Sequence, residues 1–364
     1  MRRIVVVLAA LTGVVVQAAA PADAWGRVAA LYEQRLQQAG IVGSSLLVVK
    51  DGLIAHTAFE GYHDRASKRQ TDADTIYHWA SITKTLTGVA IMQLRDRGLL
   101  SLDDPAVKYV PELREVHNPY GDISQVTIRH LMMHSAGFRA GTWPWGGDQP
   151  WHPFEPTRWA QVVAMMPYTE LQFQPGTSYS YSNPGVIFLG RIIELFSGDD
   201  YEIYINKNIF MPLGMSRSFF DRAPYFLAGN RSHSYEADDD GIREQRFDFD
   251  SGITVSNGGL NAPIGDMANW LTFLIDGNET ILKRSSLEEM SKPQIRAKDG
   301  EGGSGDQNGF ISRLYVHRPS RSGYVVSFNT DVTSKRDPRH TTRAVDNDLR
   351  DTIVRELFVP LAPR

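Results

Sequence analysis

The spacing of apolar side chains divides the first hundred residues into helices and strands. Two segments repeat apolar positions every three or four residues, as the buried face of a helix does, and three shorter segments are strand-like. Asp51-Gly52 separates two of the strand-like segments and is a strong hairpin signal. The expected elements are a helix at residues 25–38, strands at 44–49, 53–59 and 75–79, and a buried helix at 81–97.

The residue pattern changes in the middle of the chain, and strand-like segments appear again towards its end. Helical spacing alternates there with long loops rich in proline, glycine and aromatic residues, and Asp240-Gly241 turns a second hairpin. In chain order, we expect helices at 128–134, 186–196, 201–209 and 264–276, a loop at 141–156, a hairpin at 231–247, strands at 310–316 and 324–329, and a helix at 342–358.

This order of elements predicts an α+β fold. Strands occur at both ends of the chain and helices between them, so the two ends are expected to form one antiparallel sheet flanked by helices, with a mostly helical region inserted. We assign residues 25–98 and 300–364 to the sheet region and residues 99–299 to the helical region of one domain. A chain of 364 residues is long enough for a core of this size.

Residues 1–24 have the layout of a secretory signal peptide. Arg2 and Arg3 precede an apolar run from Ile4 to Val16, and small residues with an A-x-A pattern follow. A membrane anchor is the alternative, but the apolar run is short for a bilayer span. We therefore expect an exported protein, periplasmic or secreted, that has no stable membrane span after processing.

Composition limits the chemistry further. The chain has no cysteine, which excludes disulfides, thiolate metal sites and a cysteine nucleophile. The formal net charge is -4 at pH 7 and no long basic run is present, which argues against a nucleic-acid partner. The expected partner is a small-molecule or peptide substrate. No metal or organic cofactor is implied, and the oligomeric state is left open.

Ser81-Ile82-Thr83-Lys84 is the first candidate for chemistry. A serine hydroxyl needs a base beside it at neutral pH, and residues three apart on a helix share a face, so Lys84 is expected beside Ser81. Lys84 can act as the base only when it is neutral. From a reference pKa near 10.4, this costs about 4 kcal/mol at pH 7, which burial or a neighbouring cation can supply. About one such motif is expected by chance in a chain of this length, so the motif alone is weak evidence for a catalytic role. The neighbouring sequence has to support it.

The segment 173–185 is the second candidate. Tyr181 lies there between proline and glycine residues, which suits a rigid loop that positions side chains. A tyrosine phenol can relay a proton to a leaving group if nearby cations lower its pKa. Asn183 can hydrogen-bond the substrate or the lysine. A packing role is the alternative for Tyr181.

Together, Ser81-x-x-Lys84 and Tyr181-Ser182-Asn183 resemble the first two active-site motifs of serine β-lactamases and penicillin-binding proteins. The resemblance is closest to the class C β-lactamase-like branch, which includes D-alanyl-D-alanine carboxypeptidases, D-aminopeptidases and esterases. It implies that Ser81 is the nucleophile and a backbone donor of the oxyanion hole, Lys84 its base, Tyr181 the proton relay and Asn183 a substrate contact. Further matches follow in order at residues 99–105, 130–138, 212–215 and 258–260.

The third motif of that family is incomplete in this chain. Its members carry Lys-Thr-Gly or His-x-Gly on a strand shortly before a Gly-Phe pair. Gly309-Phe310 is present, but Gly303-Ser304-Gly305 occupies the expected place. The resemblance therefore implies that Ser304 and Gly305 line the substrate site without the usual cation or imidazole.

The segment before Gly309 is also short for the family. Residues 292–308 are polar and glycine-rich, and their pattern predicts no strand, which suggests that part of the sheet is deleted. Lys298 and Arg296 are the candidates to supply the missing cation.

Other sites were weighed against this one. His130 and His134 have the i, i+4 spacing of helical zinc ligands, but the glutamate of H-E-x-x-H is absent. The segment 238–241 hints at calcium but lacks the alternating ligands of an EF-hand loop. No G-x-S-x-G is present, which argues against an α/β-hydrolase nucleophile. Three tryptophans either line a substrate cleft or pack their own loop: Trp143, Trp145 and Trp151.

The sequence thus predicts a serine hydrolase that forms an acyl-enzyme on an amide or ester. A D-Ala-D-Ala peptide, a β-lactam and a small ester all fit, and resemblance of fold does not choose among them. The alternative is a non-catalytic binding protein on the same scaffold. The missing cation and the short segment before Gly309 favour that alternative.

Overall fold

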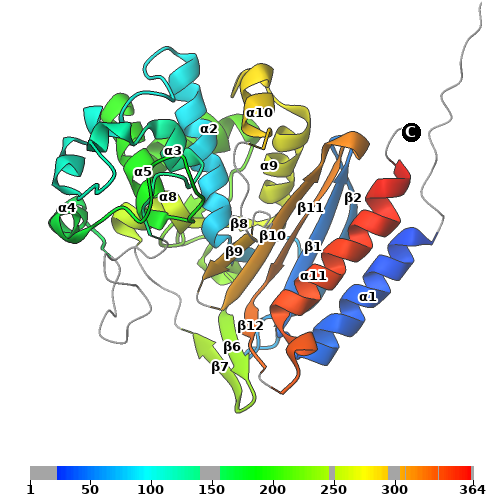
Figure 1. Cartoon of the computed structure of the whole chain (residues 1–364). Coiled ribbons are helices and arrows are strands. Elements are labelled where there is room, and N and C mark those ends of the chain that lie inside the picture. The colour runs from blue at the N-terminus through cyan, green and yellow to red at the C-terminus, as the bar shows by residue number, and fades with distance from the viewer. Residues whose placement is uncertain are drawn as a thin grey trace, which may run out of the picture.

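The computed structural model describes residues 23–139, 156–245, 251–293, 304–307, 309–334 and 336–361. At its centre is a six-stranded antiparallel sheet with the order β3-β2-β1-β11-β10-β9 (Figure 1). Both ends of the chain contribute to this one sheet, which confirms the predicted α+β fold. The strands are β1 (Gly43–Lys50), β2 (Leu53–Asp64), β3 (Arg69–Gln70), β9 (Ser304–Gln307), β10 (Phe310–His317) and β11 (Ser322–Phe328).

The central pair of strands, β1 and β11, joins the two chain ends. Their register runs from Ser44 opposite Phe328 to Lys50 opposite Ser322. Nearly every residue of the pair is buried, because both faces of the sheet are covered. Alternate side chains of a strand point to opposite faces. Accordingly, Leu46 and Val48 pack into one core while Leu47 and Val49 pack into the other.

Helices cover both faces of the sheet. The terminal helices α1 (Ala24–Ala39) and α11 (Thr342–Ile353) lie side by side on one face. The helix α9 (Ile264–Asp276) packs against β1, β10 and β11 on the other face. Arg313 on β10 and Asp346 on α11 form a buried ion pair, in which the guanidinium Nε lies 2.7 Å from both carboxylate oxygens. This pair attaches α11 to the sheet.

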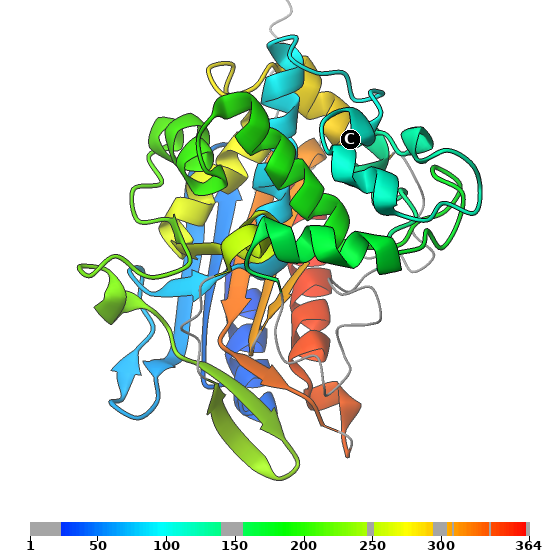
Figure 2. The ribbon, with the colours of Figure 1, turned by 90° about the vertical axis from the view of Figure 1, so that its left-hand side faces the viewer.

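The helical region of the structure faces the viewer in Figure 2. Its central helix is α2 (Thr83–Asp96), which precedes the expected range 99–299 and packs against α5 (Asn183–Ser197) and α8 (Val255–Gly258). The apolar residues at helical spacing along this helix are buried, as expected: Leu86, Val89, Ala90 and Leu94. The remaining helices are α3 (Ile128–Met132), α4 (Trp159–Met165), α6 (Tyr201–Ile205), α7 (Met211–Leu213) and α10 (Arg284–Met290).

Two small sheets connect the layers. In the first, β4 (Ile76–His78) pairs with β8 (Leu260–Pro263), which also pairs with β5 (Phe219–Phe220). This sheet carries the chain from the main sheet to the start of α2. In the second, β6 (Ser234–Asp238) and β7 (Gly241–Gln245) form the predicted hairpin, and β12 (Thr330–Val332) runs parallel to β6.

The structure corrects one prediction about the sheet. Residues 292–308 were expected to contain no strand, yet β9 (Ser304–Gln307) pairs antiparallel with β10 as the last strand of the sheet. Gly309 turns the chain between these strands with a φ of +83°, a conformation that favours glycine. An edge strand that is polar and contains glycine has no hydrophobic alternation by which it could be recognised.

Helix ends differ from the predictions more modestly. The helix expected at residues 81–97 begins with a separate 3₁₀ turn at Ala80–Ile82, and α3 ends at Met132, short of His134. The segments 201–209 and 342–358 each finish in a π-helical turn. The loop predicted at residues 141–156 lies almost entirely outside the described residues. In the described parts of the chain, no helix combines the length and apolar character that crossing a membrane requires.

We predict that Asp346→Ala lowers the free energy of unfolding by about 3–5 kcal/mol, because it leaves the Arg313 guanidinium buried without its partner. Urea unfolding followed by circular dichroism measures this change. The matched control is Asp351→Ala, whose carboxylate pairs with Arg350 at the surface. That change should cost less than about 1 kcal/mol. Equal effects of the two substitutions would show that the buried pair does not anchor α11.

Candidate active site

Ser81 lies in a short 3₁₀ turn at the junction between β4 and α2. The preceding residue, Ala80, has a φ of +45°, which a residue with a Cβ rarely adopts. The turn is held from both sides by β8. The backbone N–H of Trp79 donates to the carbonyl of Leu260, and the Leu260 N–H donates to Thr83 Oγ1. These bonds fix the position of the Ser81 hydroxyl at the head of α2.

Lys84 stands beside Ser81, as the spacing predicts. Its Nζ lies 2.9 Å from Ser81 Oγ and donates a second hydrogen bond of 2.7 Å to the backbone carbonyl of Asn257. Asn257 belongs to α8, so the lysine joins the start of α2 to a second helix. The side chain is half-buried. The amine is therefore held within proton-transfer distance of the serine hydroxyl.

Tyr181 also contacts Ser81. Its hydroxyl lies 2.6 Å from Ser81 Oγ, and Lys84 Nζ lies 4.7 Å from the centre of its ring. Burial raises the pKa of Tyr181 to about 12, and the hydrogen bond with Ser81 offsets this only in part. The phenol is therefore neutral at pH 7 and carries a proton that it can donate.

His134 positions the loop that carries Tyr181. Its backbone carbonyl accepts from the Ser180 N–H at 2.9 Å, and its ring Nδ1 accepts from the Ser182 N–H at 3.1 Å. The ring also lies against that of Tyr181, with 4.6 Å between the centroids. Because Nδ1 accepts a hydrogen bond, the proton of the neutral imidazole is on Nε2. The backbone N–H groups of Ser180 and Ser182, on either side of Tyr181, thus both donate to His134.

Burial, and after it the charge of Lys84, lower the pKa of His134 to about 4, so the ring is neutral at pH 7. The zinc interpretation of this segment does not match the geometry. The His130 ring lies against the backbone of Gln125 and Thr127 and takes part in capping α3. Within the described ranges, no three histidine or acidic side chains gather as metal ligands would. Sequence inspection marked His134 only as a possible zinc ligand and missed this positioning contact.

Asn183 is the first residue of α5, directly after the Tyr181 loop. Ser182 caps this helix by accepting a hydrogen bond from the Gly185 N–H. The Oδ1 atom of Asn183 is buried without a hydrogen-bond partner among the described residues. A buried acceptor without a partner is costly. The described residues thus leave the hydrogen-bonding capacity of this amide oxygen unused.

The strand β9 lies directly against the turn that carries Ser81. A Cβ atom added to Gly305 would come within 2.3 Å of the Trp79 carbonyl oxygen and 2.5 Å of Ser312 Oγ, so only glycine fits there. Ser304 pairs with Arg313 at the start of the strand. The strand that carries the degenerate third motif thus lies beside the turn that carries Ser81. Gly303, Arg296 and Lys298 lie outside the described residues.

Two uncharged side chains link β9 to β4 beside the Ser81 turn. His78 on β4 approaches Gln307 on β9, with 3.0 Å between Nε2 and Oε1. The Gln307 amide lies close to Gly258, the residue after the Asn257 carbonyl that binds Lys84. Burial lowers the pKa of His78 to about 4, so its ring is uncharged at pH 7. Nothing in the sequence pattern singled out His78 or Gln307, because their meeting depends on the strand β9.

This fold, with Ser81, Lys84 and Tyr181 gathered at the head of its central helix, is that of the β-lactamase-like serine hydrolases. The chain belongs to the Beta-lactamase family, whose model matches residues 28–341. Homologues with this fold are serine hydrolases that act on amides, esters or β-lactams.

Several relatives are informative. Protein flp of Staphylococcus aureus (strain COL) is 26% identical over 311 residues, which cover 85% of this chain and 60% of flp. The chain thus spans about 60% of the length of that curated relative. A penicillin-binding protein homologue from Pyrococcus abyssi, described as octameric, is 28% identical with a TM-score of 0.69, covering 84% of this chain and 73% of its own. EstCE1, a hydrolase with promiscuous acyltransferase activity, has a TM-score of 0.76 at 18% identity, covering 91% of this chain and 98% of its own.

We predict that His134→Phe slows acylation of Ser81 by about tenfold, because the aromatic ring remains but the acceptor for the Ser182 N–H is lost. His134→Asn should be closer to the wild type, because Asn can accept that bond and tolerates the φ of +54° at this position. The rate of covalent labelling by a fluorophosphonate measures both. Equal rates for the two variants would contradict a positioning role.

The same histidine links stability to pH. Its pKa is about 4 in the folded protein and near 6.5 in the unfolded chain, so between these values the unfolded chain binds more protons. The free energy of unfolding should therefore fall as the pH is lowered from about 6.5 to about 4, by up to about 3 kcal/mol from this group. In His134→Asn this part of the pH dependence should be absent. Urea unfolding at several pH values tests the difference.

Proposed function

We propose that the protein is a serine hydrolase that cleaves an amide or ester through an acyl-enzyme on Ser81. The observation that carries the proposal is the position of one hydroxyl between an amine and a phenol. Ser81 Oγ lies 2.9 Å from Lys84 Nζ and 2.6 Å from Tyr181 Oη. Such contacts with a base and a proton donor are what a serine needs to act as a nucleophile.

The reaction follows from these distances. Neutral Lys84 takes the proton of Ser81 as Oγ bonds to the substrate carbonyl carbon, and the carbonyl oxygen becomes an oxyanion near the Ser81 backbone N–H. Collapse of this intermediate breaks the bond to the leaving group, which receives the Tyr181 proton, and the proton held by Lys84 replaces it on the phenol. Water then attacks the acyl carbon, releasing a carboxylic acid and restoring the Ser81 hydroxyl.

We further propose that substrates lie between the Tyr181 loop and β9, with Asn183, Ser304 and Gly305 as contacts. On this side of the site, Gln307 of β9 contacts the neutral His78 ring. The residues that could supply a cation for a substrate carboxylate, Arg296 and Lys298, lie outside the described residues. A D-Ala-D-Ala peptide, a β-lactam and a small ester therefore all remain candidate substrates.

The non-catalytic alternative has less support. Its basis was the missing cation and an incomplete sheet, but β9 is present against the Ser81 turn. A protein that only binds its ligand does not need a lysine and a tyrosine that both contact one serine hydroxyl. The labelling experiment below separates the two functions, because a protein that only binds its ligand forms no adduct.

We predict that a fluorophosphonate labels Ser81, and that Lys84→Ala slows this labelling by about 100-fold to 10,000-fold because the general base is lost. Tyr181→Phe should slow hydrolysis of an alkyl ester much more than labelling, because fluoride leaves without a proton and an alkoxide does not. Mass spectrometry of the intact protein locates and times the adduct.

Two controls accompany these variants. Ser81→Ala should give no adduct, and Lys207→Ala, which changes a surface lysine paired with Asp199, should label at the wild-type rate. Wild-type protein that is folded but remains unlabelled would refute the hydrolase proposal. A Lys84→Ala rate equal to that of the wild type would leave Lys84 with a structural role alone.

We also propose that the protein is exported and that residues 1–24 form a cleaved leader, on the basis of their charge and apolar pattern. N-terminal sequencing of the protein expressed in a bacterial host is expected to start near residue 25 in the exported fraction. A mature protein that still begins at Met1 would contradict the leader.

A further inference from the structure

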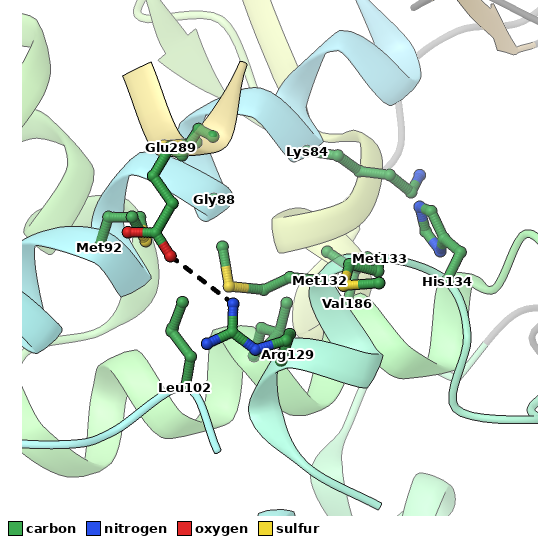
Figure 3. Close-up of a pocket in the computed structure, with 12 residues that line it drawn as sticks. Lys84, Gly88, Met92, Leu102, Arg129, Met132, Met133, His134, Val186 and Glu289 are labelled. Atoms are coloured by element: carbon green, nitrogen blue, oxygen red, sulfur yellow. Dashed lines mark ion pairs between the residues drawn. The ribbon is translucent and has the colours of Figure 1, made fainter. Parts of the chain in front are cut away.

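A pocket of about 180 Å³ lies between four helices of the helical region, alongside the catalytic candidates. Its walls come from α2, α3, α5 and α10. Figure 3 shows Lys84 and His134 at one end and the ion pair of Arg129 with Glu289 near the other. Ser81, Tyr181 and Asn183 do not line it. The pocket is therefore a neighbour of the proposed substrate site rather than a part of it.

The chemistry of the walls selects an uncharged, apolar occupant. The walls consist mainly of aliphatic and thioether side chains, including Met92, Met132, Met133 and Met290. The charges at the outer end already neutralise one another, since Arg129 pairs with Asp103 as well as with Glu289. An apolar cavity of about 150 Å³ in another protein is large enough to bind benzene. A pocket of this size and lining therefore suits a molecule with about six carbon atoms.

Two features keep this space open and adaptable. Gly88 lies in the interior of α2, where glycine is less stable than alanine, and its missing side chain leaves room in the wall. A Cβ at this position would meet only the terminal methyl of Met290, at 3.1 Å. Methionine side chains are flexible and polarizable, so four of them can adjust to ligands of different shape.

The inner end of the pocket reaches the proposed base. Lys84 forms part of the pocket wall while its Nζ contacts Ser81, one helical turn before Gly88 on the same helix. His134, which positions Tyr181, lines the same end. An apolar molecule here would exclude water from the flank of the lysine. Exclusion of water disfavours the charged amine and favours the neutral base.

We propose that this pocket binds a small, uncharged, apolar molecule of about the size of benzene, and that the bound molecule accelerates acylation of Ser81. The acceleration rests on the proposed hydrolase function, whereas the binding does not. The ligand and the substrate occupy separate sites that share Lys84, which makes the ligand an activator rather than a competitor.

Binding is tested with the full protein labelled with ¹³C at the methionine methyl groups, titrated with benzene. The methyl signals of Met92, Met132, Met133 and Met290 should shift with one saturation curve. Met215 and Met267 are buried elsewhere and should not shift, which serves as an internal control. Absence of saturable shifts in the four pocket methionines would overturn the proposal.

Variants of Gly88 locate the site. Gly88→Leu should fill the pocket and abolish the shifts, and Gly88→Ala should weaken binding severalfold. Gly265→Ala, a helical glycine with no heavy atom within 4 Å of the added Cβ, is the matched control and should bind benzene as the wild type does. The unshifted Met267 signal reports that each variant is folded. Wild-type affinity in Gly88→Ala and in a folded Gly88→Leu would overturn the assignment.

Labelling of Ser81 by a fluorophosphonate at pH 7, with and without saturating benzene, tests the coupling. The rate should rise about threefold or more in the wild type and stay constant in Gly88→Leu. A rate that does not change, or that falls, in protein shown to have bound benzene would overturn the activation. Protein that binds benzene but is never labelled would refute the hydrolase function and leave the binding site established.

Discussion

The pairing of β1 with β11 is the constraint on which the rest of the structure depends. It joins segments from opposite ends of the chain at the centre of the sheet, and both strands are buried on two faces. Because β10 and β9 follow in order beside β11, this pairing also fixes where the edge strand lies. Gly305 on this edge strand lies against the backbone of Trp79, two residues before Ser81 in the chain. The geometry of the candidate site is therefore set by contacts between residues that are far apart in sequence.

The candidate site carries few charges, and hydrogen bonds fix the positions of its main side chains. The Ser81 turn is tied to β8, the Tyr181 loop is tied to His134, and Lys84 is tied to a helical carbonyl. Burial holds the Tyr181 phenol and the imidazoles of His78 and His134 in their neutral forms at pH 7. Because their pKa values are lowered to about 4, the two imidazoles are weak bases that compete little for the proton that the serine must lose. The low polarity also strengthens any interaction with an oxyanion that forms there.

The sequence predicted the parts of this protein that repeat a local pattern. The helices at residues 25–38 and 264–276 and the hairpin at Asp51-Gly52 follow from spacing and turn chemistry, and the contact of Lys84 with Ser81 follows from helical geometry. The strand β9 was missed because it is polar and pairs with β10 alone. The raised pKa of Tyr181 could not be read from the sequence, because it is caused by burial, which depends on the tertiary structure. The positioning contact of His134 was missed because it runs partly through the backbone.

The pairing of the two chain ends has a consequence for synthesis. A ribosome makes β1 and β2 one after the other, but the other partner of β1 lies far downstream in the segment Ser322–Phe328. An isolated hairpin is marginally stable at best. The central sheet therefore cannot assemble until the ribosome has made Ser322–Phe328. The nascent chain stays open while the residues between the two strands are translated, and a product that is truncated before Ser322 lacks the strand that completes the sheet.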